Sequence, residues 1–169
     1  MAKPPRDRFE AASRTYFVSA TAAGGRFLLQ SDRMAQLFLD TLCGYRDQGK
    51  FALHAFVVMP NHVHLLLTPA EDLALERVIQ LIKGGFSHAA GELLGRGAEI
   101  WQRGYVEHCV RDENDFERHR AYIHNNPLRR GLVNSPEEYP YSSANPRYQT
   151  DPIPQRLKPL APAATFRHG

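Results

Sequence analysis

Two histidines separated by one residue, His62 and His64 in the stretch MPNHVHLLL, are the side chains with the clearest potential for chemistry. A β-strand alternates its faces with a period of two residues, so both imidazoles project from one face while Val63, Leu65 and Leu67 project from the other. At this spacing the two Cα atoms lie roughly 6 to 7 Å apart, so both rings can lean onto one ion about 2 Å from each nitrogen. The pair predicts a metal site, although a half-exposed strand with two histidines on its polar face explains so short a pattern equally well.

A tyrosine and an asparagine four residues apart, Tyr122 and Asn126 in AYIHNNP, form the second group of interest. In a helix such residues lie on one face, with roughly 5 to 6 Å between their Cβ atoms. A helical wheel places Arg118 and His119 on the same arc, beside an apolar arc that can pack on a sheet. The helix could deliver a nucleophilic hydroxyl and a third metal ligand together. Alternatively, Tyr122 is a boundary residue and Asn126 precedes a helix stop at Pro127.

Four strands and three helices are expected to position these groups. The strands are predicted over residues 15–22, 51–59, 62–69 and 105–111, and the helices over 31–49, 73–95 and 114–125. Pro60 and Asn61 indicate a hairpin that has the histidine pair at the start of its second strand. Asn114 or Asp115 is expected to cap the last helix, and the Gly84-Gly85 pair to bend or split the one before it. The order βαββαβ with an additional C-terminal helix predicts a ferredoxin-like α+β fold with an antiparallel sheet.

The length and composition indicate one globular domain. The chain has 169 residues, of which 43% are hydrophobic and 23% are charged, as in ordinary folded domains. From residue 146 the sequence becomes rich in proline, so we expect a domain over 1–145 and an irregular tail over 146–169. Cys43 and Cys109 form no short-spaced motif, which argues against a disulfide framework and against a cysteine-rich zinc site.

The location and charge of the protein can also be predicted from the sequence. Its start lacks the apolar segment of a secretory signal, and no run reaches the roughly 18 apolar residues of a membrane span, so a cytoplasmic location is expected.

The formal net charge of +3 suits a polyanionic partner without requiring one. The candidate phosphate contacts are Arg14, Arg103, Arg118, His119, Arg129 and Arg130. Each alone is an ordinary surface charge, but the sequence PLRRG directly after the last helix is well placed to grip a nucleic-acid strand.

Three stretches in order carry a family resemblance: HAFVVMPNHVHLLLTP, IWQRGYVEHCVRDENDFERHRAYIHNNPLRRGLV and YPYSS. Together they resemble the REP-associated tyrosine transposases, a group within the HUH single-tyrosine transposase superfamily. The resemblance implies that His62 and His64 form the HUH metal-binding pair, that Tyr122 is the nucleophile, and that Asn126 is the third ligand. It also implies Mg²⁺ or Mn²⁺, whereas two imidazoles and an amide by themselves favour zinc, manganese or another transition ion over magnesium.

The function implied by the resemblance is that of a metal-dependent DNA endonuclease and strand transferase acting on single-stranded or hairpin DNA from repetitive extragenic palindromes (REP). Tyr122 would form a 5′-phosphotyrosine intermediate, which a 3′-hydroxyl could later attack to rejoin strands. His119 is a candidate acceptor for the phenol proton, and a phosphate contact is its more ordinary role. The protein would be a homodimer or a monomer, nucleoid-associated when bound to DNA. Two alternatives are a catalytically silent DNA- or RNA-binding protein of the same fold and a zinc hydrolase that uses His62, His64 and His108.

Overall fold

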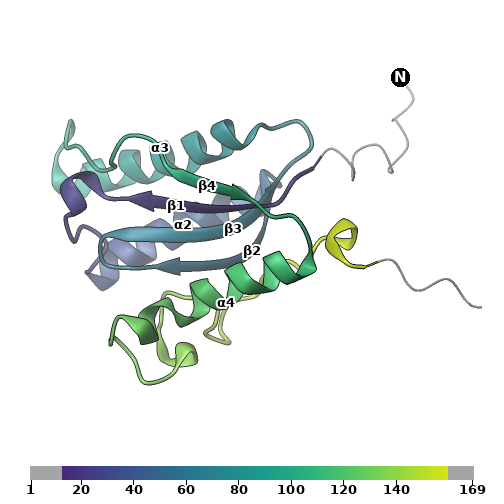
Figure 1. Ribbon diagram of the computed structural model, residues 1–169. Coiled ribbons are helices and arrows are strands. Elements are labelled where there is room, and N and C mark those ends of the chain that lie inside the picture. The colour runs from purple at the N-terminus through teal and green to yellow at the C-terminus, as the bar shows by residue number, and fades with distance from the viewer. Residues whose placement is uncertain (1–12, 160–169) are drawn as a thin grey trace, which may run out of the picture.

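A four-stranded antiparallel sheet with the strand order β2-β3-β1-β4 forms the centre of the protein (Figure 1). The computed structural model describes residues 13–159. The strands are β1 (Tyr16–Thr21), β2 (Phe51–Val58), β3 (His62–Pro69) and β4 (Val106–Cys109), and the helices are α2 (Asp32–Asp47), α3 (Leu75–Leu94) and α4 (Glu113–Arg129). Three short 3₁₀ helices are η1 (Ala23–Gly25), η2 (Pro136–Glu138) and η3 (Gln155–Leu157). The predicted α+β class with an antiparallel sheet is confirmed.

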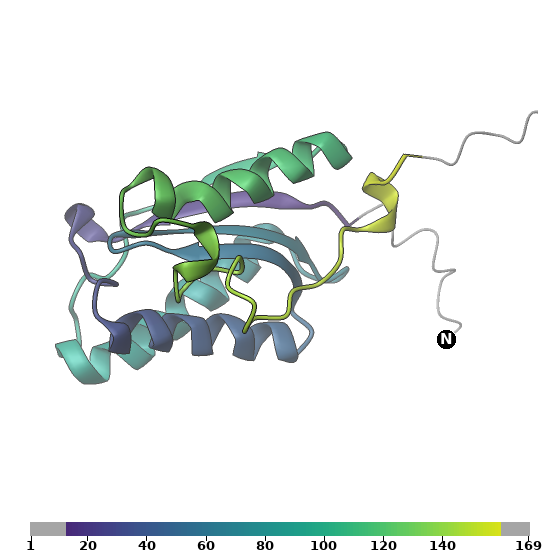
Figure 2. The same cartoon turned by 90° about the horizontal axis from the view of Figure 1, so that it is seen from below.

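Helices α2 and α3 cover one face of the sheet, and α4 covers the other (Figure 2). Val63 and Leu65 of β3 are buried in the first of these layers with the aromatic rings of Phe38 and Phe86. The ring centroids of the two phenylalanines lie 5.5 Å apart. Burial of such side chains contributes roughly 1.5 to 3 kcal/mol each. This layer has more of them than the layer beneath α4 and is the larger core. The apolar side predicted for the second hairpin strand therefore faces α2 and α3.

The second layer lies between the sheet and α4. Phe116 and Ile123, from the apolar arc of α4, are fully buried and belong to one cluster with Ala55, Val57 and Leu66 of the sheet. Their spacing of seven residues, about two helical turns, puts both side chains on one side of the helix. This contact fixes the rotation of α4 about its axis, and with it the direction in which the neighbouring polar arc points.

The ends of α4 differ from those expected. Its N-cap is Asp112, whose carboxylate accepts a hydrogen bond from the Asp115 backbone N–H at 2.8 Å, so the cap predicted at Asn114 or Asp115 is wrong. The helix also continues through Pro127 to Arg129, so Pro127 is not its stop. A proline costs one backbone hydrogen bond inside a helix. This loss falls in the last turn, and the chain turns away at Gly131, which has a φ of +72°.

The described part of the proline-rich segment, residues 146–159, packs against the sheet and has η3 as its regular element. The Arg46 guanidinium of α2 donates to both carboxylate oxygens of Asp151, at 2.8 and 2.9 Å, and the Leu53 backbone N–H donates to the same carboxylate at 2.7 Å. The division into a domain over 1–145 and a tail over 146–169 stays a prediction, and residues 1–12 and 160–169 of these two parts lie outside the described residues.

Of the helices within 13–159, none has the length and apolar character that a membrane span requires.

Helix α3 runs without a break from Leu75 to Leu94, so of the bend or split predicted at Gly84-Gly85 the split is wrong, and the bend stays a prediction. Gly85 lies against α2, where a Cβ atom would be 2.8 Å from the Tyr45 ring and 3.2 Å from the Thr41 methyl group. A residue without a side chain is needed for this close approach. The glycine therefore serves helix packing.

The two glycines provide a matched test of this packing. Gly85→Ala is expected to lower the free energy of unfolding by about 1 kcal/mol, because the Tyr45 ring must shift to admit a methyl group. A Cβ at Gly84 would meet nothing within 4 Å, so Gly84→Ala should raise the same free energy by about 0.5 to 1 kcal/mol. Urea unfolding followed by circular dichroism measures both. Equal stability of the two variants would contradict the proposed contact.

Candidate active site

The face of the sheet beneath α4 carries the histidine pair. His62 is half-buried and His64 is buried, and their ring centroids lie 4.7 Å apart. Ser19 of β1 pairs with His64, and Thr21 pairs with His62, so the two rings sit beside a central strand. Both imidazoles therefore project from one face of β3, opposite to Val63.

Burial keeps both imidazoles of the pair uncharged. Desolvation, together with the nearby positive charge of Arg130, lowers the pKa of His62 to about 4. Desolvation lowers the pKa of His64 to about 3, with further contributions from His62 and Arg130. The Asn61 side-chain oxygen accepts a hydrogen bond from His62 Nδ1 at 2.7 Å, which leaves Nε2 with its lone pair. Neutral imidazole is the form that binds a metal.

Two buried side-chain atoms within residues 13–159 have no hydrogen-bond partner: Nδ1 of His64 and Oδ1 of Asn126. Asn126 is only 4% exposed. Leaving a buried polar atom unpaired costs about 1 to 3 kcal/mol, so a ligand that meets these atoms would relieve that cost. An imidazole nitrogen and an amide oxygen are both donors for divalent cations. The residues therefore fit a metal ion.

Tyr122 projects from α4 next to the histidine pair of the same chain. Its ring centroid lies 5.3 Å from that of His64 and 5.9 Å from that of Phe17, with the rings tilted by 66° and 77°. The guanidinium carbon of Arg129 lies 5.4 Å from the Tyr122 ring centroid. Tyr122 remains 40% exposed, and Asn126 follows it by one turn on the same side of α4. The tyrosine is thus held by ring contacts while staying accessible.

A cavity of about 460 Å³ opens beside this tyrosine. It is bounded by β1, β3, β4 and α4, and its lining residues are Phe17, Ser19, His64, Val106, Arg118, His119 and Tyr122. The volume lies within the range of pockets that take small molecules, roughly 300 to 1,000 Å³. A small group of a ligand can therefore approach Tyr122 and His64 together.

Four of the six predicted phosphate contacts lie around this cavity and the histidine pair: Arg118, His119, Arg129 and Arg130. The other two do not join them. Arg14 borders a separate hollow that also contains the carboxylates of Glu76 and Glu107, and Arg103 is exposed in the turn before β4. The basic residues near the site are therefore those that precede and follow Tyr122 in the chain.

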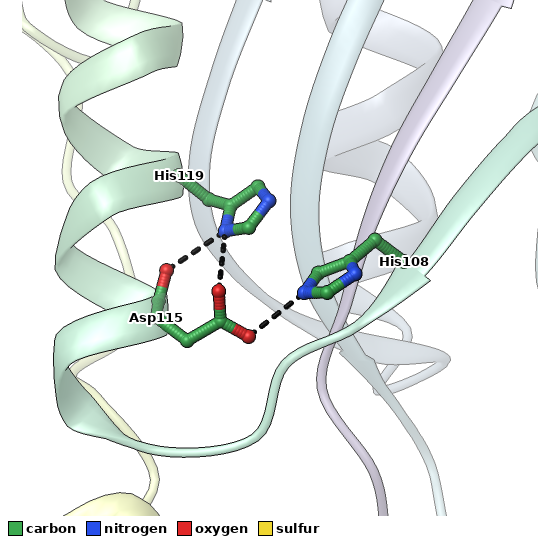
Figure 3. Close-up of side chains that lie close together, drawn as sticks. All are labelled: His108, Asp115 and His119. Atoms are coloured by element: carbon green, nitrogen blue, oxygen red, sulfur yellow. Dashed lines mark hydrogen bonds and ion pairs between the residues drawn. The ribbon is translucent and has the colours of Figure 1, made fainter.

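A hydrogen-bonded cluster of His108, Asp115 and His119 lies between β4 and the first turns of α4 (Figure 3). The buried Asp115 carboxylate accepts from His108 Nε2 at 2.8 Å and from the Arg111 backbone N–H at 3.0 Å. Burial raises the pKa of Asp115, but these hydrogen bonds and the two neighbouring histidines outweigh it and lower the pKa to about 2. His108 is thus bound to Asp115, which removes support for a zinc hydrolase that would use it together with His62 and His64.

Sequence reasoning missed the role of Phe17 and interpreted Asp115 only as a helix cap. The Phe17 ring touches those of His64, His119 and Tyr122, at centroid distances of 5.4, 5.0 and 5.9 Å. The period of two in β1 could have placed Phe17 on the site face, but only once the pairing with β3 was known. For Asp115 the available signal was its spacing of four residues from His119 on one helix.

A family model and two curated proteins with similar sequences are described as transposases. Residues 20–126 match the family model described as "Transposase IS200 like", a range that holds the histidine pair, Tyr122 and Asn126. A REP-associated tyrosine transposase from Escherichia coli (strain K12) is 29% identical over 137 residues, which cover 80% of this chain and 79% of that protein. A protein from Haemophilus influenzae, named as a candidate REP-associated tyrosine transposase, is 30% identical over 133 residues, covering 69% of this chain and 76% of its own.

A solved structure shows the same arrangement of elements. It is that of a REP-associated tyrosine transposase bound to a REP hairpin, and it superposes with a TM-score of 0.68 at 26% identity, covering 91% of this chain and 96% of the other. The match therefore includes nearly the whole of both chains. The chain belongs to the IS200-like transposases and, within them, to the family of REP-associated tyrosine transposases.

Proposed function

We propose that the protein is a metal-dependent DNA endonuclease and strand transferase in which Tyr122 is the nucleophile. One observation carries the proposal: the Tyr122 ring lies 5.3 Å from the ring of a neutral, buried His64 at the edge of an open cavity. The phenol is the nucleophile at this cavity, and the imidazole beside it is in the form that can bind a metal.

We propose single-stranded or hairpin DNA as the substrate. The solved relative was determined with a REP hairpin bound, which supports a hairpin here. Arg118 borders the cavity, and Arg129 lies over the tyrosine ring, so a phosphate near the hydroxyl would meet two guanidinium groups. The exposed apolar side chain of Val106 and the ring of Phe17 offer surfaces on which an unpaired base can rest.

In the proposed cleavage step the phenolic oxygen of Tyr122 forms a bond to phosphorus, and the bond from phosphorus to the 3′ oxygen breaks. The products are a 5′-phosphotyrosine and a free 3′-hydroxyl. Because the intermediate is again a phosphodiester, another 3′-hydroxyl can attack it and release the tyrosine, which joins two strands. Arg129, whose guanidinium lies over the Tyr122 ring, is the residue we assign to stabilise the negative charge that develops on the departing or attacking phenolic oxygen.

We assign a divalent ion, Mg²⁺ or Mn²⁺, to His62, His64 and Asn126. The unpaired atoms of His64 and Asn126 and the lowered pKa values of the two histidines support this assignment. When bound, such an ion supplies Lewis-acid polarisation of a phosphate oxygen and orients the phosphodiester. Two nitrogen donors with an amide oxygen suit Mn²⁺ better than Mg²⁺.

A covalent-adduct assay tests the proposal. The protein is incubated with a labelled DNA hairpin that carries a single-stranded extension and with Mn²⁺, and the products are separated on denaturing gels. A label at the 3′ end should migrate with the protein, whereas a label at the 5′ end should appear in a released fragment, because the tyrosine keeps the 5′ phosphate. Mass spectrometry after proteolysis should then locate the nucleotide on Tyr122. Tight hairpin binding without any adduct, in Mn²⁺ and in Mg²⁺, would contradict the proposal and favour the catalytically silent nucleic-acid binding protein.

A further inference from the structure

We propose that Nε2 of His119 accepts the phenol proton of Tyr122 during cleavage and returns it during strand joining, with Asp115 as the residue that positions His119. This inference rests on the proposed function, because it assigns a proton acceptor to the nucleophile named there. A phenol is neutral near pH 7 and needs such an acceptor when it attacks.

The hydrogen bonds of His119 define which ring nitrogen is available. Nδ1 lies 2.8 Å from the backbone carbonyl oxygen of Asp115 and 3.2 Å from its carboxylate oxygen Oδ1. Both of these oxygens accept, so Nδ1 carries the hydrogen, and Nε2 of the neutral ring carries the lone pair. Figure 3 shows Nε2 on the side of the ring that points away from Asp115. His119 is therefore oriented to accept a proton at Nε2.

His119 and Tyr122 share one side of α4 and one cavity. Their spacing of three residues places the two side chains next to each other on the helix surface. Both line the cavity of about 460 Å³, and both rings pack on Phe17, with centroid distances of 5.0 Å for His119 and 5.9 Å for Tyr122. Phe17 thus holds the two rings against a common surface.

Asp115 can hold the imidazole in place and stabilise its charged form. It is 2% exposed and remains a carboxylate, with a pKa of about 2. A buried carboxylate on Nδ1 of a histidine fixes the tautomer and stabilises the imidazolium that forms when Nε2 takes a proton. The other charged and titratable groups next to His119 are Arg118 on α4, which donates to Asp115 at 3.2 Å, and His108 on β4, whose ring stacks 4.6 Å from that of His119.

A second metal site is the alternative for the same three side chains, because their ligand atoms lie within 4.8 Å of one another. Two observations argue against it. The carboxylate oxygens and one nitrogen of each histidine already form hydrogen bonds, and the guanidinium of Arg118 lies against the same carboxylate. The polar atoms of this cluster already pair with one another, and a guanidinium lies beside them. Such a cluster suits proton transfer better than metal binding.

The proposed step balances in both directions. As the bond between the Tyr122 oxygen and phosphorus forms, the phenol hydrogen moves to His119 Nε2, and the 3′ oxygen leaves and takes up a proton from solvent water. In strand joining, a 3′-hydroxyl attacks phosphorus and loses its proton to solvent. The bond to tyrosine then breaks, and the phenolic oxygen regains its proton from the imidazolium. No oxidant, reductant or nucleotide is consumed.

Single-turnover cleavage of the labelled hairpin by the full chain, in Mn²⁺, measures the effect. His119→Ala is expected to slow formation of the Tyr122 adduct by about 100-fold or more, while hairpin affinity stays within a few-fold. Added imidazole should restore part of the rate to His119→Ala and none to Tyr122→Phe. Asp115→Asn, which keeps the shape but not the charge, should slow the reaction less and should shift its pH profile. His88→Gln, an exposed histidine of α3 on the opposite face of the sheet, is the matched control and should react as the wild type.

A second substrate distinguishes two roles for His119: accepting the proton of Tyr122, or donating a proton to the leaving 3′ oxygen. A 3′-bridging phosphorothiolate leaves as a thiolate and needs no proton, so it should not relieve the defect of His119→Ala. Wild-type rates in both His119→Ala and the better packed His119→Gln would overturn the inference and leave the proposed function intact. A rate loss matched by an equal loss of hairpin affinity would overturn it in favour of a phosphate contact. Absence of an adduct from the wild-type protein would overturn the proposed function itself.

Discussion

Tyr122→Phe is expected to abolish the covalent DNA adduct while leaving hairpin affinity within a few-fold of the wild type. Phenylalanine keeps the ring contacts with Phe17 and His64 and deletes only the oxygen that would attack phosphorus. Loss of a nucleophile typically slows an enzyme by on the order of 10⁴-fold or more. The adduct on denaturing gels and the affinity in a filter-binding or polarisation assay give the two measurements.

The chain has seven tyrosines, so the assignment of one of them needs a matched control. Tyr105→Phe removes a hydroxyl just before β4, where the ring packs against the core under α2 and α3. This variant should form the adduct at the wild-type rate. If Tyr122→Phe cleaves DNA as fast as the wild type, or if the nucleotide maps to another tyrosine, the proposed nucleophile is wrong even though the protein binds DNA.

His64→Ala is expected to lose Mn²⁺ binding and cleavage together while the protein stays folded. The imidazole projects from the α4 side of β3, so its removal leaves the larger core around Val63 and Leu65 in place. The affinity for Mn²⁺ should fall by about 100-fold or more. Wild-type protein at an Mn²⁺ concentration of about 100 times the dissociation constant should gain about 2.7 kcal/mol of stability. Calorimetric titration and thermal unfolding with and without Mn²⁺ measure binding without relying on activity.

A neighbouring asparagine provides the control for the third ligand. Asn126→Ala should weaken Mn²⁺ binding, whereas Asn125→Ala should not, because Asn125 is exposed on another side of α4 and borders a hollow with Glu137. Unchanged Mn²⁺ affinity in His64→Ala and Asn126→Ala would show that the ion binds elsewhere. His108→Ala would then test whether the cluster around Asp115 holds it.

The features that depend on one periodic element were predictable from the sequence. The period of two in β3 separates His62 and His64 from Val63, and the turn of the helix separates Tyr122 and Asn126 from the apolar arc of α4. Both separations hold in the structure because burial of the apolar side is the dominant favourable term in folding. The fold class followed from the order of such elements.

Features that depend on contacts distant in sequence were not predictable in this way. Phe17 reaches the site only through the pairing of β1 with β3, and no local pattern gives that register. The cap of α4 is Asp112, while the carboxylate of Asp115 is engaged by His108 from β4 and by the backbone of Arg111. The packing role of Gly85 in α3 was missed because the side chain that requires this glycine, Tyr45, comes from another helix.

The alternation along β3 also has an evolutionary consequence. Its odd-numbered residues Val63, Leu65 and Leu67 belong to the larger core, while His62 and His64 lie on the other face. A lineage could therefore lose the histidines by mutation and still inherit the folded sheet and its cationic surroundings. Under the proposed function, such a descendant would retain a surface for structured DNA without the ability to cut it, so a host genome could keep it for binding alone.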